Sequence, residues 1–164
     1  MKTPANRGFS LLELCVGLAL VAILAGLSVP SFREAHRATA VRTATWELMT
    51  GLQQTRGSAI VESRPAVLCL TDAAGNCSSG GAGGWRAFVE IGTGTRTLAS
   101  RALPAGIAVR GNRDRIRFSE RALAASTATL TICDVQGVAA PRAIVISQNA
   151  RARFATAAPG ACRA

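Results

Sequence analysis

The sequence is poor in the residues from which most enzyme and metal sites are built. It has no tyrosine, a single histidine (His36) and an aromatic content of only 4%. Its acidic residues are scattered, and no Ser/His/Asp or Cys/His set is apparent. Zinc sites need several histidines or closely spaced cysteine pairs, and neither is present. We therefore expect no catalysis, no metal and no cofactor, and we expect His36 to lie at the surface.

Acidic residues are also few in comparison with basic ones. Lys and Arg together number 19 against 9 Asp and Glu, for a net charge of +10, and Lys2 is the only lysine. Such an excess favours polyanionic partners, for example nucleic acid or anionic lipid. A genome rich in G and C would also encode much arginine and alanine. The charge therefore permits a polyanionic partner without identifying one.

The sequence does contain a long apolar run near its start. From Phe9 to Val29 there are 21 residues, and Glu13 is the only charged one. A helix of that length spans roughly 30 Å, enough to cross the core of a bilayer. The basic residues before the run predict a cytoplasmic N-terminus. A secretory signal peptide has a shorter apolar core, of about 7–15 residues, although residues 22–25 could mimic its cleavage site.

A plain membrane anchor does not explain Glu13, because an ionisable group at membrane depth costs a few kcal/mol unless it is paired. The stretch RGFSLLEL, from Arg7 to Leu14, resembles the class III signal of type IV pilins and type II secretion pseudopilins. The resemblance implies that prepilin peptidase cuts between Gly8 and Phe9, and that the new N-terminal Phe9 is methylated. Pro30 also matches a common pilin position.

The same resemblance gives Glu13 a role in filament assembly. When apolar helices leave the lipid and bundle in a filament, the Glu13 carboxylate can meet the N-terminal amine of a neighbouring subunit, in a low-dielectric setting that favours the pairing. We expect a cleaved leader peptide at residues 1–8, a transmembrane and filament-core helix at residues 9–30, and a periplasmic pilin head at residues 31–164. Cys15 is expected to be a small apolar residue within the run.

Beyond Pro30 the pattern predicts an amphipathic half of the helix that reaches to about residue 62. Apolar residues recur there at steps of three and four or their multiples, at Ala38, Val41, Leu48, Leu52 and Ala59. Short runs rich in β-branched or aromatic residues follow, namely AVLCL, WRAFVEI, IRF, ATLTIC and RAIVIS. We therefore expect an α+β pilin fold, with the long helix packed on a C-terminal antiparallel β-sheet. Residues 72–84 are expected to form a flexible loop and not a phosphate-binding one.

Four cysteines outside the apolar run are typical of an exported domain. Four cysteines allow three pairings. We favour Cys69–Cys77, which flank a short loop, and Cys133–Cys162, which would tie the last strands to the C-terminus. Structural disulfides need an oxidising compartment, and the periplasm is one.

The pattern of the whole chain resembles the GspH/FimT branch of minor pilins. RPAVLCL and GGWRAFVEI follow the long helix, and ISQNARARF lies near the end. Members of that branch linked to DNA uptake carry a Gly-Arg-x-Arg element near the C-terminus. The corresponding residues here are Ala150, Arg151, Ala152 and Arg153. Both arginines are kept, while the missing glycine puts the family's tight turn in question at this position.

A second group of arginines lies in the run RGNRDRIRFSER. A strand there would place Arg113, Arg115 and Arg117 on one face and Ile116 and Phe118 on the other. From residue 86 onward the chain has 12 arginines against four acids. The C-terminal half therefore carries most of the positive charge.

Guanidinium groups on an exposed face suit phosphate contacts that read no bases. We expect weak, sequence-independent binding of double-stranded DNA, with Arg151 and Arg153 as the main candidates and the arginines at 113, 115 and 117 as support. The alternative is a solvated basic face with no ligand. Few aromatic residues alternate with the arginines, so the sequence does not support a stacking platform for single strands.

Together these features predict a minor pilin of a type IV pilus, at or near the filament tip, that assists assembly and captures DNA for natural transformation. Before assembly it would lie in the inner membrane with a periplasmic head, and it would then join other pilins in the filament. The alternative is a minor pseudopilin of type II secretion that acts without DNA, against which the strongly basic head argues mildly.

Overall fold

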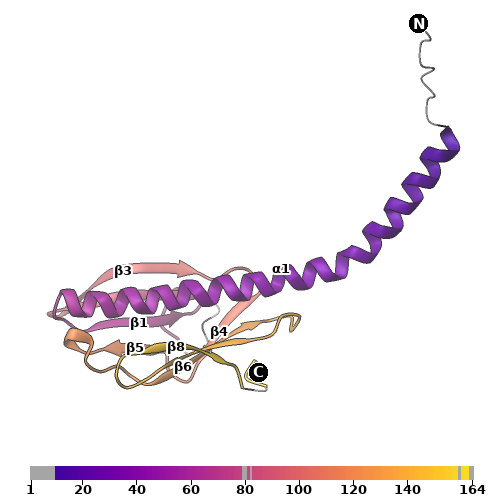
Figure 1. The fold of residues 1–164 in the computed structure, drawn as a ribbon. Coiled ribbons are helices and arrows are strands. Elements are labelled where there is room, and N and C mark those ends of the chain that lie inside the picture. Colours follow the sequence, from indigo (N-terminus) through magenta and orange to yellow (C-terminus); the bar gives the residue numbers. More distant parts are fainter. Residues whose placement is uncertain (1–9, 79–80, 82, 159, 163–164) are drawn as a thin grey trace, which may run out of the picture. The chain divides into compact units, whose positions relative to one another are not determined.

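The computed structural model describes residues 10–78, 81, 83–158 and 160–162, and for residues 27–31 it describes the backbone alone. The chain divides into two compact units, residues 1–35 and residues 36–164. The elements shown in Figure 1 are, in chain order, helix α1 (Leu11–Val61), strands β1 (Ala66–Thr71), β2 (Gly84–Ile91), β3 (Gly94–Ala102), β4 (Ile107–Gly111) and β5 (Arg115–Phe118), the short 3-10 helix η1 (Glu120–Ala122), and strands β6 (Ala128–Asp134), β7 (Arg142–Ile146) and β8 (Ala152–Thr156). This is the predicted α+β fold.

The first unit holds the N-terminal part of helix α1. Every side chain described in it, at residues 10–26 and 32–35, is exposed. The exposed apolar residues include Leu11 and Leu12 near the start of the helix. Within the described part of the chain, no helix is both long and apolar enough to count as a membrane span. The expected cleavage and methylation positions, Gly8 and Phe9, lie outside the described residues.

The second unit, residues 36–164, is called the head below, and it contains two four-stranded antiparallel sheets. Sheet A has the strand order β3-β2-β1-β5, and sheet B has the order β4-β6-β7-β8. The sequence predicts a single sheet, and its five predicted runs do not include β3, β4 or β8. Strand β3 is exposed along most of its length, so it lacks the apolar alternation by which strands are recognised.

Helix α1 packs one face against the inner faces of both sheets. Its buried residues follow steps of three and four, and they include Val41, Leu48 and Leu52. These side chains share one core cluster with residues of both sheets, among them Leu68 of β1 and Ile144 of β7. Ala38, which the sequence places on this face, is exposed because the buried stripe begins only at residue 41. The helix ends at Val61, close to the predicted end at about residue 62, and Arg64-Pro65 follows, where the residue before proline avoids helical geometry.

Two disulfides tie down loops of the head. Cys69 pairs with Cys77 and Cys133 pairs with Cys162, at Cα–Cα distances of 5.5 and 5.6 Å. These are the two pairings favoured from the sequence. Cys15 is free and exposed.

The turn between β7 and β8 is tight even though it contains no glycine. The N–H of Ala150 donates to the carbonyl of Ser147 at 3.0 Å, and the N–H of Ser147 donates to the carbonyl of Arg151 at 3.0 Å. Ala150 itself has φ 59° and is buried. This is a turn closed by a residue in the left-handed conformation, which glycine adopts most easily. The turn that the missing glycine put in question is therefore made, with alanine in the strained position.

Asp134, at the end of β6, is a carboxylate whose side chain is fully shielded from solvent. The backbone N–H groups of Gln136, Val138 and Ala139 each donate a hydrogen bond of 3.1 Å to it. The guanidinium of Arg37 lies 4.0 Å away. Burial raises the pKa of Asp134, but the three N–H groups and Arg37 outweigh it, so its pKa lies below the ordinary carboxyl value.

Replacement of Asp134 with asparagine should destabilise the head by about 1.5–3 kcal/mol at pH 7, because a charged hydrogen-bond acceptor is lost from a buried position. Since the folded-state pKa is lowered, the contribution of Asp134 is complete above about pH 4 and is lost as the pH falls through the folded-state pKa. Urea unfolding should therefore show a large difference between wild type and Asp134→Asn at pH 7 and a smaller one at pH 3. The exposed Asp114→Asn is the control, and a difference for Asp134→Asn that does not change with pH would contradict the assignment.

Ala150→Val should destabilise the head by about 2 kcal/mol or more, because a β-branched residue fits poorly at positive φ. Ala150→Gly should stay within about 1 kcal/mol of wild type, since relief of the left-handed strain is offset by the greater freedom of glycine in the unfolded chain. Thermal or urea unfolding of the two variants measures this contrast. Equal stabilities would mean that the positive φ at residue 150 is not needed.

Candidate functional site

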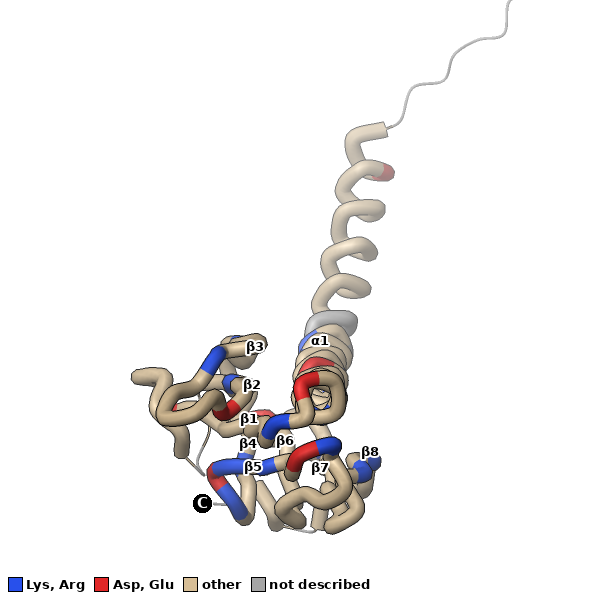
Figure 2. Tube along the Cα trace, turned by 90° about the vertical axis from the view of Figure 1, so that its left-hand side faces the viewer, with Lys and Arg blue, Asp and Glu red and all other residues tan. Residues whose placement is uncertain are grey.

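Strand β5 carries the first group of predicted arginines on an exposed face. Arg115 and Arg117 are exposed while Ile116 and Phe118 are buried, which confirms the predicted alternation. Arg113 precedes the strand and is also exposed. β5 is an edge strand of sheet A, because it pairs only with β1. The basic positions of β5 can be followed as blue segments in Figure 2.

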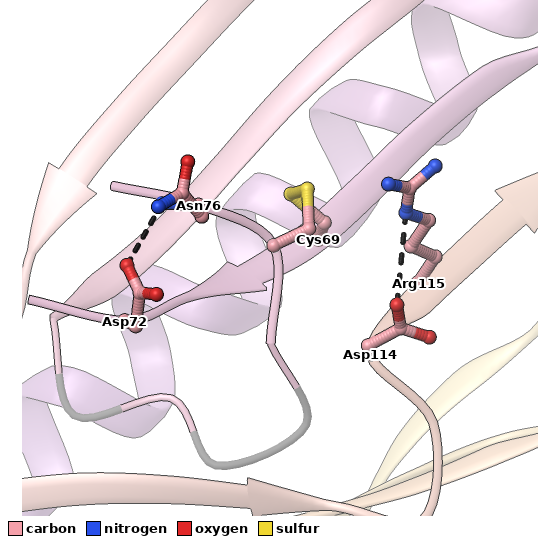
Figure 3. The surroundings of a disulfide bond; sticks show 6 residues. Cys69, Asp72, Asn76, Asp114 and Arg115 are labelled. Atoms are coloured by element: carbon pink, nitrogen blue, oxygen red, sulfur yellow. Dashed lines mark hydrogen bonds and ion pairs between the residues drawn. A yellow bond between two sulfur atoms is a disulfide. The ribbon is translucent and has the colours of Figure 1, made fainter. Parts of the chain in front are cut away.

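Each arginine of this group already has a partner within the head. The Arg113 Nε donates to the carbonyl of Thr127 at 3.0 Å. The Arg115 Nε lies 3.6 Å from a carboxylate oxygen of Asp114, close to the Cys69 disulfide in Figure 3. These contacts occupy one N–H group of each of the two guanidinium groups and leave the others open with respect to the residues that the structure describes.

Arg117 is the most strongly engaged of the three. Its Nη2 and Nε donate to one Glu90 oxygen at 2.8 and 3.2 Å, and Nε also reaches the other oxygen at 3.3 Å. The hydrogen bonds to Glu90 raise the pKa of Arg117 above its ordinary value. A phosphate at this position would have to compete with Glu90, so Arg117 is a poorer ligand than the sequence suggests.

The second group, Arg151 and Arg153, lies on the β7–β8 hairpin at the edge of sheet B. Both residues are exposed, Arg151 in the turn and Arg153 within β8. Neither forms an ion pair or a side-chain hydrogen bond with any residue that the structure describes. The turn is also held by Ser147, whose hydroxyl donates to the side-chain oxygen of Asn149. This hairpin therefore presents two uncompensated guanidinium groups.

The two groups belong to different sheets, but the segment after β5 connects them. Phe118 forms an isolated bridge with Ala125, and the N–H of Ala125 donates to the carbonyl of Gln148 in the β7–β8 turn at 2.9 Å. η1 lies in this connection and carries Arg121, which is exposed and has φ 58°. We call the whole set the arginine band, and it comprises Arg113, Arg115, Arg117, Arg121, Arg151 and Arg153.

Sequence reasoning missed Arg121, although it lies in the same run as the first group. The strand alternation that identifies the others stops at Phe118, and Arg121 follows in η1. Arg121 has no ion pair or side-chain hydrogen bond to a described residue. A charge count over the run would have included it, whereas a periodicity criterion could not.

Glu13 is exposed in the first turn of α1. Over the described ranges, no three His, Cys, Asp or Glu side chains come together as a metal-binding cluster.

Comparison with known proteins finds a matching family and a similar solved fold. Residues 44–150 match the family described as type II transport protein GspH, and residues 3–29 match the prokaryotic N-terminal methylation motif. No match was found among curated proteins. The fold is similar to that of the type IV minor pilin FimU of Pseudomonas aeruginosa strain PAO1, solved in two crystal forms.

The likeness to FimU covers 74% of this chain in both crystal forms, with 94% and 98% of the FimU chains covered. The TM-scores are 0.59 and 0.57 at 18% sequence identity, which shows a shared fold. The family match covers well over half of the chain, from within the head part of α1 through β7 and into the β7–β8 turn, and it ends before Arg151 and β8. The chain therefore belongs to the GspH family of pilin-like proteins and carries the N-terminal methylation motif of prepilins.

Proposed function

We propose that this protein is a minor pilin of a type IV pilus, located at or near the filament tip, and that its head binds double-stranded DNA without reading the sequence, for uptake in natural transformation. The observation that carries the DNA-binding part is the pair Arg151 and Arg153. They are exposed and unpaired within the described part of the head, and they sit on a hairpin fixed by backbone hydrogen bonds.

The geometry of this pair suits a phosphate backbone. Arg151 directly precedes β8 and Arg153 lies within it. Residues two apart in an extended strand are about 7 Å apart, about twice the rise of roughly 3.4 Å per phosphate along one DNA strand. An edge hairpin can approach a duplex without obstruction from a neighbouring strand, and β8 pairs only with β7. Arg121, next along the arginine band, would add a third contact. The arginines engaged with Glu90 and Asp114 would contribute less.

The N-terminal unit supports the filament part of the proposal. Its described side chains are exposed, most of them are apolar, and Glu13 is the only charged residue described in the run before Arg33. An apolar helix that is exposed all round needs a lipid or protein environment. We infer an inner-membrane precursor with a periplasmic head, cut by prepilin peptidase between Gly8 and Phe9 and methylated on Phe9. It would then be assembled with other pilins through Glu13.

A second candidate function is favoured by the family description itself, which names a type II transport protein. A minor pseudopilin of a secretion filament would share the fold, the leader and Glu13. It would have no use for unpaired arginines on the β7–β8 hairpin. DNA binding by the head is therefore the property that separates the two functions.

Replacement of Arg151 and Arg153 with alanine should weaken duplex binding by the head and lower the salt dependence of log K by about two. The head suits this test because its buried core and both disulfides lie within residues 36–164. Gel shifts or fluorescence anisotropy with a random-sequence duplex at several salt concentrations measure the effect. Arg142→Ala is the matched control, since Arg142 is an exposed arginine at the far end of the same hairpin. Unchanged affinity in the double variant would remove these residues from the DNA site.

Glu13→Ala should leave membrane insertion and leader cleavage intact and should reduce incorporation into the filament, because the carboxylate partner of a neighbouring N-terminal amine is lost. Immunodetection in sheared filaments and in membranes, with mass spectrometry of the mature N-terminus, separates these steps. Glu34→Ala, a charge removal outside the apolar run, should assemble normally. Wild-type levels of the Glu13 variant in the filament would contradict the docking role.

A further inference from the structure

A groove of about 580 Å³ lies between the head part of helix α1 and strands β2 and β3. Its volume falls within the range of small-ligand pockets. The side chains that matter for its chemistry are two tryptophans, two arginines and one acid, which are Trp46, Trp85, Arg42, Arg101 and Glu47. The groove lies outside the arginine band and has no part in the function proposed above.

The floor of the groove is rigid. Trp85 of β2 is buried, with an exposed fraction of 4%. Gly51 of α1 lies directly against its ring, since a Cβ on Gly51 would lie only 2.6 Å from the Trp85 ring atom Cη2. Any larger residue at position 51 would push the helix away from β2. The indole of Trp85 is therefore fixed between helix and sheet.

The rim of the groove contains an aromatic ring that is open to solvent. Trp46 of α1 is 52% exposed, and its ring meets that of Phe154 of β8 edge to face, with the centroids 4.7 Å apart. Because the contact is edge to face and half of the residue is exposed, the indole retains open ring surface. Phe154 follows Arg153 in the chain, so the rim adjoins one end of the arginine band.

The charges of the groove favour an anion. Arg42 and Arg101 are both exposed, and neither forms an ion pair or side-chain hydrogen bond with a described residue. Arg42 lies one helical turn before Trp46 on the same side of α1. Glu47 is the single acidic residue among the lining side chains. A concave surface with open indole and free guanidinium groups has the components that bind unpaired nucleotides, namely aromatic stacking for bases and cations for phosphates.

We propose that this groove binds single-stranded DNA, with a base stacked on Trp46 and the adjoining phosphates held by Arg42 and Arg101. The inference rests on the proposed DNA-binding function and extends it to a second form of the substrate. A base inside a duplex is stacked on its neighbours and cannot reach Trp46, whereas an overhang or a frayed end can. The sequence does not support a stacking platform, because few aromatic residues alternate with the arginines. The fold brings Trp46 of α1 against Phe154 of β8 and leaves its indole open.

The test uses the head and a short oligothymidine, and it is read by tryptophan fluorescence and by anisotropy of a labelled strand. The chain has two tryptophans, so Trp85→Phe leaves Trp46 as the sole emitter. The oligonucleotide should quench that emission. Trp46→Ala should weaken binding about 5- to 150-fold, the range for loss of one base–aromatic stack. Trp46→Phe should retain most of the affinity, which keeps the test valid if the alanine variant folds poorly.

The charge variants give the matched comparison. Arg42→Ala with Arg101→Ala should weaken oligothymidine binding and leave duplex binding nearly unchanged, whereas Arg151→Ala with Arg153→Ala should mainly weaken duplex binding. Glu47→Gln should strengthen oligothymidine binding, because one repulsive charge is removed. These opposite patterns separate failure of the groove from failure of the duplex site.

Two outcomes would overturn the proposal. The first is unchanged Trp46 emission at saturating oligothymidine, or unchanged affinity in both Trp46→Ala and the Arg42/Arg101 variant. The second is unaltered DNA binding in these variants together with reduced incorporation into the filament, which would make the groove a contact between subunits.

Discussion

The structure of the head depends on the burial of one face of helix α1 against two sheets at once. Val41, Leu48 and Leu52 contribute to a core that is shared with both sheets, and each fully buried aliphatic side chain stabilises the fold by about 1.5–3 kcal/mol. With this face fixed, the remaining faces of the helix must point away from the core. Trp46 and Arg42 are thereby exposed, and the helix rests on Trp85 of sheet A and touches Phe154 of sheet B. The groove and its aromatic rim are consequences of that packing.

Periodicity in the sequence predicts the features that depend on a residue and its near neighbours in the chain. The helix, five strands and the outward direction of Arg115 and Arg117 follow from such local patterns. The two disulfides match the favoured pairings, but Cys133 and Cys162 are 29 residues apart, so that pairing is not a local pattern. The division into two sheets does not follow from local patterns either, because it depends on which strands pair. Strand β3 was missed because little of it is buried.

The value of each arginine as a ligand could not be predicted either, because it depends on partners that the fold brings from elsewhere. Arg117 and Glu90 are 27 residues apart in the chain. Sheet A places their strands, β5 and β2, on either side of β1, so the two long side chains meet. Arg151 and Arg153 have the same alternating spacing as Arg115 and Arg117, but no described acid reaches them. Trp46 likewise contacts Phe154, which lies more than a hundred residues later in the chain. The alternation of residues along a strand predicts which side chains share an exposed face. Whether an arginine on that face has an acidic partner depends on how the strands pair in the sheet.

Unpaired arginines at a sheet edge repel one another and weaken the segment that carries them, so the hairpin needs other constraints. The disulfide between Cys133 and Cys162 supplies one, because the loop that it closes contains all of β7 and β8. A cross-link over 29 residues stabilises by about 3–4 kcal/mol in the loop-entropy picture. The carboxylate of Asp134, next to Cys133, fixes the backbone that enters this loop and accepts its N–H groups. A covalent tie and a buried carboxylate thus constrain the segment that carries Arg151 and Arg153, whose charges have no partner among the described residues. The covalent tie depends on an oxidising compartment.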